Sequence, residues 1–379
     1  MAATVKAGIS ASLTGQFSTQ GQQALAGLTA WVDYVNQQGG LAVGDAKLPV
    51  TLVSYDDGST ADNTRRATER LITDDNVDLL FGPYSAGLTT AAAEVAESHG
   101  RVIWNHGGAG DAHYARGFRK VISILTPADQ YLVGAPELVR QANPEANRLV
   151  ILRIDTGAFA RLVARGAETA AHDLGFTTVL DLRYRPTQVS FTEIARHVAE
   201  QQPDLVVTVG RIRHDIGTAR ALARLPNRSN IGLAAVIATP IAGFEELLGE
   251  AADGFVGPSQ WEPAFSIPTP DVGPGAADAL RMLNDGASAA DVPVDYAMAQ
   301  AMAAGLVAER CVALAGDLDD DALLNVAVNA DFTTFYGRFK IDEAGRQIGR
   351  SVALVQRQHG RKVVVWPQEL AEGELQYPF

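Results

Sequence analysis

The sequence predicts an α/β protein built from two Rossmann-like, doubly wound lobes. Short runs rich in β-branched residues alternate with longer amphipathic segments, which is the pattern of strand and helix units around mostly parallel sheets. This alternation runs through two successive series, and a third block of helices follows them. A chain of 379 residues that is 47% apolar is also long enough to fill two hydrophobic cores.

The first series covers roughly the first third of the chain. Its predicted strands are residues 5–10, 49–54, 77–81, 101–104 and 121–124, and its predicted helices are residues 22–38, 61–74 and 89–98. Gly39 and Gly40 follow the first of these helices and favour its termination, because glycine readily adopts the left-handed conformation that ends many helices.

The second series repeats this architecture. Its predicted strands are residues 149–154, 177–182, 205–209, 231–237 and 254–256, and its predicted helices are residues 160–174, 192–201, 215–225 and 242–248. A proline-rich connection then leads to predicted helices 274–285, 293–315 and 318–329 and strands 337–341, 351–358 and 362–366. We therefore expect two interleaved lobes, 1–126 plus 260–347 and 127–259 plus 348–379, with a ligand cleft between them.

Composition excludes several classes of protein. Lys and Arg number 31 against 44 Asp and Glu, and the net charge of -13 argues against a nucleic-acid binder. The single cysteine, Cys311, rules out an internal disulfide and a thiolate zinc cluster, and we expect it to be a core residue. No apolar run is predicted to reach the roughly 18 residues of a membrane span. The first strand begins almost at once, so the protein is either cytosolic or lacks an export signal that was removed.

Motifs for catalysis are absent from the sequence. We find no phosphate-binding loop, no dinucleotide fingerprint after the first strand and no HExxH zinc motif. Residues 82–87 are similar to a nucleophile elbow, but Pro83 stands where that motif requires glycine, so Ser85 is not expected to be a nucleophile. The histidines also lack metal-ligand spacing. We therefore expect no enzyme activity, no cofactor and no metal.

Small polar loops follow three strands of the first series, at residues 12–21, 82–87 and 105–110. Ligands of open α/β sheets bind at the carboxyl ends of the strands, where helix N-termini present backbone N–H groups. Glycine and hydroxyl residues there suit a carboxylate, and Phe17 and Tyr84 can cover an apolar portion of a ligand. Each loop alone also fits an ordinary turn, which favours the same residues. Together the loops favour a binding cleft.

Several segments occur in the order found in one family: residues 5–9, 13–15, 35–41, 55–57, 82–85, 336–342 and 364–367. In these segments the chain resembles the leucine/isoleucine/valine-binding family of type I periplasmic solute-binding proteins, over nearly its whole length. The resemblance implies a clamshell of two lobes joined by three crossovers, which closes by a hinge over a small ligand. It also implies a monomer that is periplasmic or extracellular and delivers its ligand to the membrane permease of an ABC transporter.

The resemblance and the three loops together nominate the ligand-binding residues. They are Phe17, Gln20, Tyr84, Ser85, Ala86, Asn105, His106, Gly107, Gly108 and Ala109 in the first lobe, and Asp155, Phe159, Arg211 and Thr239 in the second. The segment Trp104-Asn105-His106 is atypical of amino-acid binders and indicates further side-chain hydrogen bonding or an aromatic ligand.

Two departures from the family pattern bear on the ligand. Residues 238–240 stand where the family pattern has an acidic residue that pairs with the ligand's ammonium group. Ala109 stands where that pattern has a hydroxyl residue. Asp155 is one substitute partner for an ammonium group; alternatively Arg211 or Arg153 pairs with the carboxylate of an acid without an amine. The predicted ligand is therefore an amino acid or an aromatic or other organic acid. A cytosolic small-molecule sensor of the same fold is the alternative function.

Overall fold

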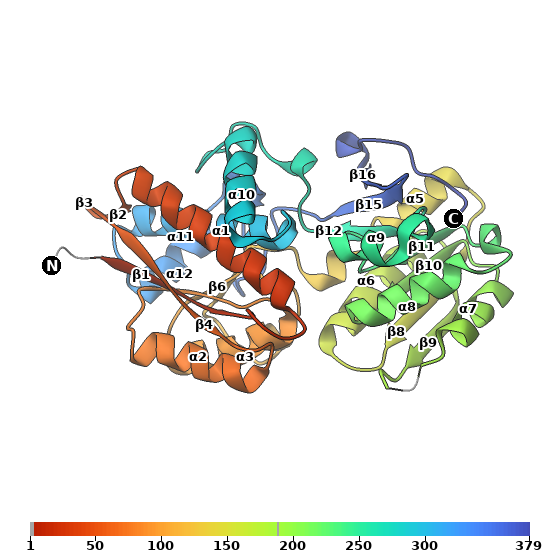
Figure 1. Cartoon of the computed structure of the whole chain (residues 1–379), viewed down its shortest axis with the longest axis horizontal. Helices are drawn as coiled ribbons and strands as arrows, with labels where there is room; N and C mark the ends of the chain where they lie inside the picture. Colours follow the sequence, from red (N-terminus) through yellow and green to blue (C-terminus); the bar gives the residue numbers. More distant parts are fainter. Residues whose placement is uncertain (1–3, 188) are drawn as a thin grey trace. The chain divides into compact units, whose positions relative to one another are not determined.

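The computed structural model describes residues 4–187 and 189–379, which form two compact units (Figure 1). Unit 1 comprises Met1–Pro127 and Phe265–Arg350, and unit 2 comprises Ala128–Ala264 and Ser351–Phe379. Each unit contains a sheet with parallel strands and flanking helices, so the predicted α/β class with two doubly wound lobes is confirmed. The colours of Figure 1 show that unit 1 combines the red and orange start of the chain with cyan and blue elements from its last third.

Unit 1 is built on a parallel sheet with the strand order β4-β1-β5-β6-β7. These strands are β1 (Val5–Ala11), β4 (Val50–Asp56), β5 (Leu79–Phe81), β6 (Ile103–Asn105) and β7 (Val121–Ser123). Its helices are α1 (Ser18–Gln37), α2 (Ala61–Thr73), α3 (Ala86–Ser98), α4 (Ala112–Ala115), α10 (Ala276–Ala290), α11 (Tyr296–Ala315) and α12 (Asp320–Asn329). Two hairpins complete the unit: β2 (Leu41–Val43) with β3 (Ala46–Leu48), and β13 (Phe332–Thr334) with β14 (Gly337–Phe339).

Helix α11 corrects one expectation from the sequence. It is long and apolar enough to cross a membrane, whereas no such segment was predicted. However, 78% of its most apolar window is buried inside the protein, which is typical of a core helix. It packs closely on α1: a Cβ at Gly305 would lie 2.3 Å from the Trp31 ring. Cys311 of this helix is fully buried, which confirms the prediction that it is a core residue.

Unit 2 contains a mixed sheet with the order β16-β15-β12-β11-β10-β8-β9. Its strands are β8 (Arg148–Ile154), β9 (Thr177–Tyr184), β10 (Leu205–Val209), β11 (Leu233–Val236), β12 (Val256–Ser259), β15 (Ala353–Gln358) and β16 (Arg361–Trp366). Its α-helices are α5 (Ala135–Ala142), α6 (Ala158–Asp173), α7 (Phe191–Glu200), α8 (Ile212–Ala223) and α9 (Ala242–Leu248). Short 3₁₀ helices lie at Ala128–Gln130, Arg228–Asn230, Gly249–Ala252, Pro263–Phe265 and Gln368–Leu370.

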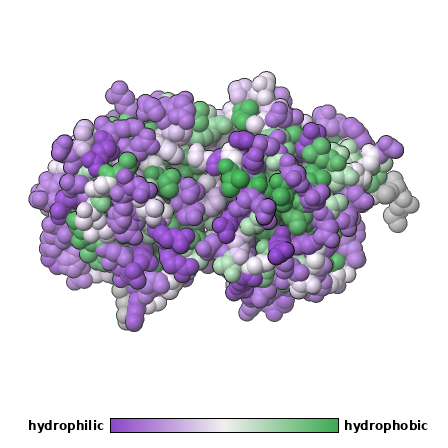
Figure 2. Space-filling view, turned by 180° about the vertical axis from the view of Figure 1, so that it is seen from behind, coloured by the Kyte–Doolittle hydropathy of each residue, from purple (hydrophilic) through white to green (hydrophobic). Residues whose placement is uncertain are grey.

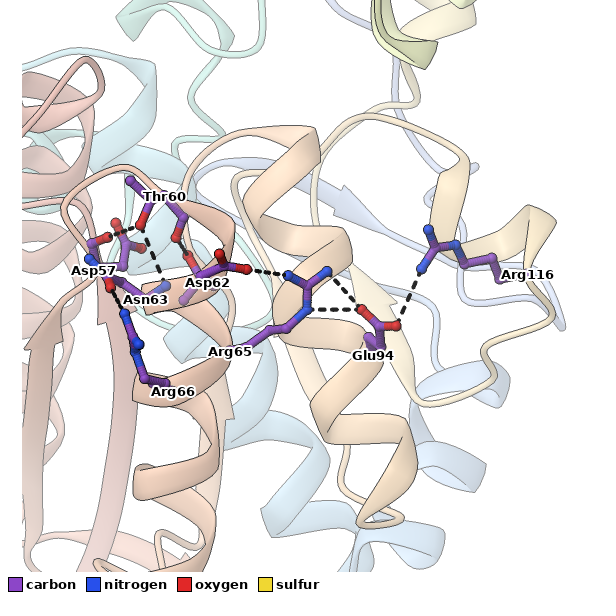
Figure 3. A network of polar contacts seen from close by, with 9 residues as sticks. Asp57, Thr60, Asp62, Asn63, Arg65, Arg66, Glu94 and Arg116 are labelled. Atoms are coloured by element: carbon purple, nitrogen blue, oxygen red, sulfur yellow. Dashed lines mark hydrogen bonds and ion pairs between the residues drawn. The ribbon is translucent and has the colours of Figure 1, made fainter.

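A small group of charged side chains links α2 to α3 on the surface of unit 1. Figure 3 shows Arg65 of α2 reaching Asp62 and Glu94, the latter on α3, with Arg65–Glu94 distances of 3.1 Å from Nε and 3.0 Å from Nη2. Both side chains are well exposed, so this pair contributes little to stability. The face seen in Figure 2 is mostly hydrophilic, and its apolar residues gather most in the right half of the view.

Candidate functional site

The three polar loops predicted from the sequence lie together at one edge of the unit 1 sheet. They follow β1, β5 and β6, which are parallel and adjacent in the order β1-β5-β6. The carboxyl ends of these strands, and the N-termini of the helices that follow two of them, therefore share one edge.

The loop after β5 ends at Ser85, which begins helix α3. Its Oγ accepts a hydrogen bond from the amide of Leu88 at 3.4 Å, and its own amide donates to the carbonyl of Gly107 at 3.0 Å. The serine backbone has φ of 87°, a strained value for a residue with a Cβ. Because this cap lengthens the helix, α3 begins at Ala86 rather than at residue 89 as predicted. The hydroxyl proton of Ser85 and the amides of Ala86 and Gly87, which precede Leu88 in α3, are further donors at this helix start.

The loop after β6 packs directly on the loop after β5. A Cβ at Gly107 would lie 2.4 Å from the carbonyl oxygen of Pro83, and one at Gly108 would lie 2.4 Å from the Thr89 Cβ. Both glycines are therefore required for the approach of the two loops. Ala109 and Ala86 remain partly exposed at this edge.

Asn105 and His106 lie inside unit 1. The amide of Asn105 donates to the Gly108 carbonyl and to the Ser123 hydroxyl, each at 2.8 Å, and its oxygen accepts from the amide of Gly108 at 2.8 Å. This side chain shapes the loop through its own hydrogen bonds. His106 is 0% exposed, and burial lowers its pKa to about 4, so the ring is neutral at pH 7. Ligand contact by these two residues stays a prediction.

Aromatic rings border the same edge. The Phe17 and Tyr84 rings meet edge to face with centroids 5.8 Å apart, and the Tyr84 hydroxyl lies 2.6 Å from that of Tyr296. Burial raises the pKa of Tyr84 to about 12, so this phenol stays protonated at neutral pH. Sequence reasoning missed Tyr296, which is the first residue of α11 and follows the capping residue Asp295.

The first loop is tied to the rest of the unit by its backbone. Ser59 accepts from the Phe17 amide at 3.1 Å and donates to the Thr14 carbonyl at 2.7 Å. Gln20 lies within α1 and is only 8% exposed, so the structure places it mostly inside the unit. Phe17, Tyr84, Ser85, Ala86 and Ala109 are thus brought to the edge, whereas Gln20 is largely covered.

In unit 2, the predicted residues follow strands β8, β10 and β11, which are also adjacent and parallel. Asp155 and Arg211 are exposed, and Arg211 occupies the position that begins α8. Phe159 packs edge to face on Tyr131, with ring centroids 5.5 Å apart. Arg153 pairs with Asp181 through two hydrogen bonds of 3.2 Å, so its guanidinium is already engaged within the unit.

Thr239 is the exception among these residues because it is 0% exposed. Its hydroxyl donates to the Val256 carbonyl at 3.1 Å. The buried Arg357 guanidinium donates to the carbonyls of Thr239 and Ile241, at 3.0 and 2.8 Å. The loop after β11 is therefore held from inside unit 2, and its one hydroxyl is committed to the fold.

A buried carboxyl lies behind the loop after β10. Asp215, in the first turn of α8, is 1% exposed, and burial raises its pKa well above the usual value, although the amides of Gly210 and Ala238 oppose this. A Cβ at Gly210 would lie 2.6 Å from the Tyr184 hydroxyl and 2.8 Å from Asp215 Oδ1. This glycine is therefore needed for the loop to pass over both groups.

The raised pKa of Asp215 predicts how stability depends on pH. The folded protein holds this proton at pH values where the unfolded chain, with a pKa near 3.8, has released it. Stability therefore falls as pH rises between these two pKa values. We expect Asp215→Asn to remove this loss, so that as pH rises above about 4 the melting temperature of the variant increases relative to that of the unsubstituted protein.

Asp181 provides a control of opposite sign. Burial raises its pKa, but hydrogen bonds from Arg153 and Arg183 outweigh this and lower it. Its contribution is present at neutral pH and is lost as pH falls, so Asp181→Asn should lower the melting temperature mainly near neutrality. Parallel pH profiles for the unsubstituted protein and Asp215→Asn would contradict the account of Asp215.

Comparison with known proteins agrees with this architecture. Leu/Ile/Val-binding protein homolog 8 of Brucella abortus is 25% identical over 214 residues, covering 54% of this chain and 51% of that protein. The chain thus spans about half the length of the curated relatives it matches. A solute-binding protein of an ABC transporter from R. palustris, solved with benzoate, is 20% identical and superimposes with a TM-score of 0.71 over 96% of both chains.

A branched-chain amino acid transporter substrate-binding protein from Streptococcus pneumoniae, solved with isoleucine, is 17% identical. It superimposes with a TM-score of 0.77 over 99% of this chain and 100% of its own. At these identities the solved structures show a common fold. The family model described as periplasmic binding protein matches residues 4–362, nearly the whole chain. The predicted resemblance is therefore confirmed, and the chain belongs to the periplasmic binding protein family.

Proposed function

We propose that the protein is an extracytoplasmic solute receptor that binds a small carboxylate-bearing ligand and delivers it to an ABC importer. The observation that carries this proposal is the meeting of two donor-bearing loops, 82–87 and 105–110, at the carboxyl edge of the unit 1 sheet. The Ser85 hydroxyl and the first amides of α3 are donors at this edge. A helix N-terminus also carries a partial positive charge that favours an anion.

The aromatic side chains suit the apolar portion of such a ligand. Phe17, Tyr84 and Tyr296 form a contiguous group beside the donors. Aromatic faces and edges bind other rings and alkyl groups while their hydroxyls stay hydrogen-bonded. The benzoate and isoleucine of the two solved relatives both combine a carboxylate with an apolar portion. These neighbours therefore support the proposed class of ligand.

Binding rather than catalysis fits the environment of Ser85. Its side chain accepts from the amide of Leu88, and its backbone bonds to Gly107. A serine nucleophile needs a base within hydrogen-bonding reach, commonly a histidine. His106 lies in the second of these loops, but its ring is buried and neither ring nitrogen is hydrogen-bonded to the Ser85 hydroxyl. We therefore propose that the protein binds its ligand without catalysing a reaction.

A thermal-shift screen followed by calorimetry tests this function. The panel contains aromatic acids, branched aliphatic acids, short dicarboxylates and amino acids. We expect at least one small acid to raise the melting temperature and to bind with a 1:1 stoichiometry, since a ligand at 100 times its Kd stabilises by about 2.7 kcal/mol. A panel in which no acid binds would contradict the proposed function.

A further inference from the structure

The loops at the proposed site present more hydrogen-bond donors than acceptors to a ligand. Several of their carbonyl oxygens already accept hydrogen bonds from within unit 1. These are Pro83 from Thr89 Oγ1 at 3.1 Å, Ser85 from the Thr89 amide at 2.9 Å, Gly107 from the Ser85 amide at 3.0 Å and Gly108 from Asn105 Nδ2 at 2.8 Å. Segments 82–87 and 105–110 also contain no acidic residue.

Neighbouring acceptors are engaged as well. Asp56 accepts from the amides of Leu13 and Gly58, both at 2.9 Å, and from the Thr14 hydroxyl at 2.7 Å. The buried Asp57 accepts from the Ser12 hydroxyl at 2.6 Å and from the Ser59 amide at 2.8 Å. Both carboxylates hold the first loop in place. Each of these loop carbonyls has one of its two lone pairs in use and both carboxylates are engaged, so the edge offers donors more readily than acceptors.

From this imbalance we infer that the site selects carboxylates that lack an ammonium group on the α-carbon. This inference rests on the proposed function and narrows its ligand class. In an α-amino acid the ammonium lies one carbon from the carboxylate, so it enters the same loops. It carries three N–H donors, and burying them without acceptors carries a large cost in free energy. An acid without the amine avoids this cost and keeps every contact of its carboxylate.

Asp111 is the rival acceptor nearest to these loops in sequence. It precedes α4, makes no capping hydrogen bond there and is partly exposed. It stands two residues beyond Ala109 in the sequence, so it is one candidate partner for an α-ammonium group, and Asp155, named above from the sequence, is the other. Asp111→Asn is therefore included in the test.

Calorimetry on matched pairs tests the inference. The pairs are 3-phenylpropionate with L-phenylalanine and 4-methylpentanoate with L-leucine, which differ only in the amine. For each pair that binds, we expect the acid without the amine to bind about tenfold tighter or more, and Asp111→Asn to leave this ratio unchanged. Equal or tighter binding of the amino acid would overturn the inference but leave the proposed function standing. If no acid of either kind binds, both the inference and the proposed function are contradicted.

A charge placed at Ala109 gives an independent readout. Ala109→Asp adds an acceptor beside the ligand's head group, and Ala109→Asn adds the same bulk without the charge. We expect the aspartate variant to bind 3-phenylpropionate about tenfold more weakly than the asparagine variant, and to shift the ratio toward L-phenylalanine. An unchanged ratio in two folded variants would contradict the inference. If the aspartate variant does not fold, the inference is tested by the relative affinity of the unsubstituted protein for 3-phenylpropionate and L-phenylalanine.

Discussion

Ala86→Glu is expected to abolish binding of the acid identified by screening while leaving the protein folded. The residue is partly exposed in the first turn of α3, and its Cβ faces the loop after β6, since a Cβ at Gly110 would lie 2.8 Å from it. A glutamate there places a negative charge beside the proposed carboxylate site, and like charges in contact cost several kcal/mol. We expect affinity to fall about 100-fold or more, measured by calorimetry.

The same charge has the opposite effect on the helix. An acid in the first turn complements the helix dipole, so the melting temperature of Ala86→Glu should equal or exceed that of the unsubstituted protein. Ala86→Gln is the matched control, because it adds similar bulk without charge and should lose less affinity. Equal affinities for the two variants would show that charge at α3 does not govern binding.

Gly107→Val has the largest expected effect on stability. A Cβ at this position would lie 2.4 Å from the Pro83 carbonyl oxygen and 2.6 Å from the Tyr84 Cα, both of them backbone atoms that cannot move aside cheaply. The two loops must separate, which also breaks the hydrogen bond from Ser85 to Gly107. We expect a loss of about 3 kcal/mol in the free energy of unfolding, measured by urea denaturation, together with loss of binding.

Gly87→Val is the control for that substitution. Gly87 is the second residue of α3, beside the loop on which Gly107 packs. It is exposed, and a Cβ there would meet no atom within 4 Å. Valine and glycine differ little in helix propensity, so stability should change by less than about 1 kcal/mol. Similar losses in the two variants would mean that the packing of the loops is not what makes Gly107 necessary.

Much of the fold and the grouping of the loops could be predicted from the sequence. Glycine-rich segments mark the ends of strands β5 and β6, at Phe81 and Asn105, and parallel strands bring such segments to one edge. Helix α3 begins earlier than predicted because the Ser85 side chain caps it, and a cap is a local geometry that periodicity does not encode.

The features that could not be predicted from the sequence depend on contacts between segments that are distant in the chain. Tyr296 joins Tyr84 across more than 200 residues of sequence, and nothing in its helical context marks it as part of the site. Its position in the sequence nominates Thr239, yet the hydroxyl of this residue donates inward to the Val256 carbonyl. The sequence does not mark helix α11 as a possible membrane span, and its burial together with its packing on α1 shows that it belongs to the core.

The most direct test of the proposed function compares the tightest-binding acid with its primary amide by calorimetry. The amide has nearly the same shape but no charge, so the comparison isolates the carboxylate. If the donors of Ser85 and α3 bind an anion, the acid should bind about 100-fold tighter or more than the amide, because charge-assisted hydrogen bonds are about twice as strong as neutral ones. Equal affinity for acid and amide would contradict a carboxylate receptor.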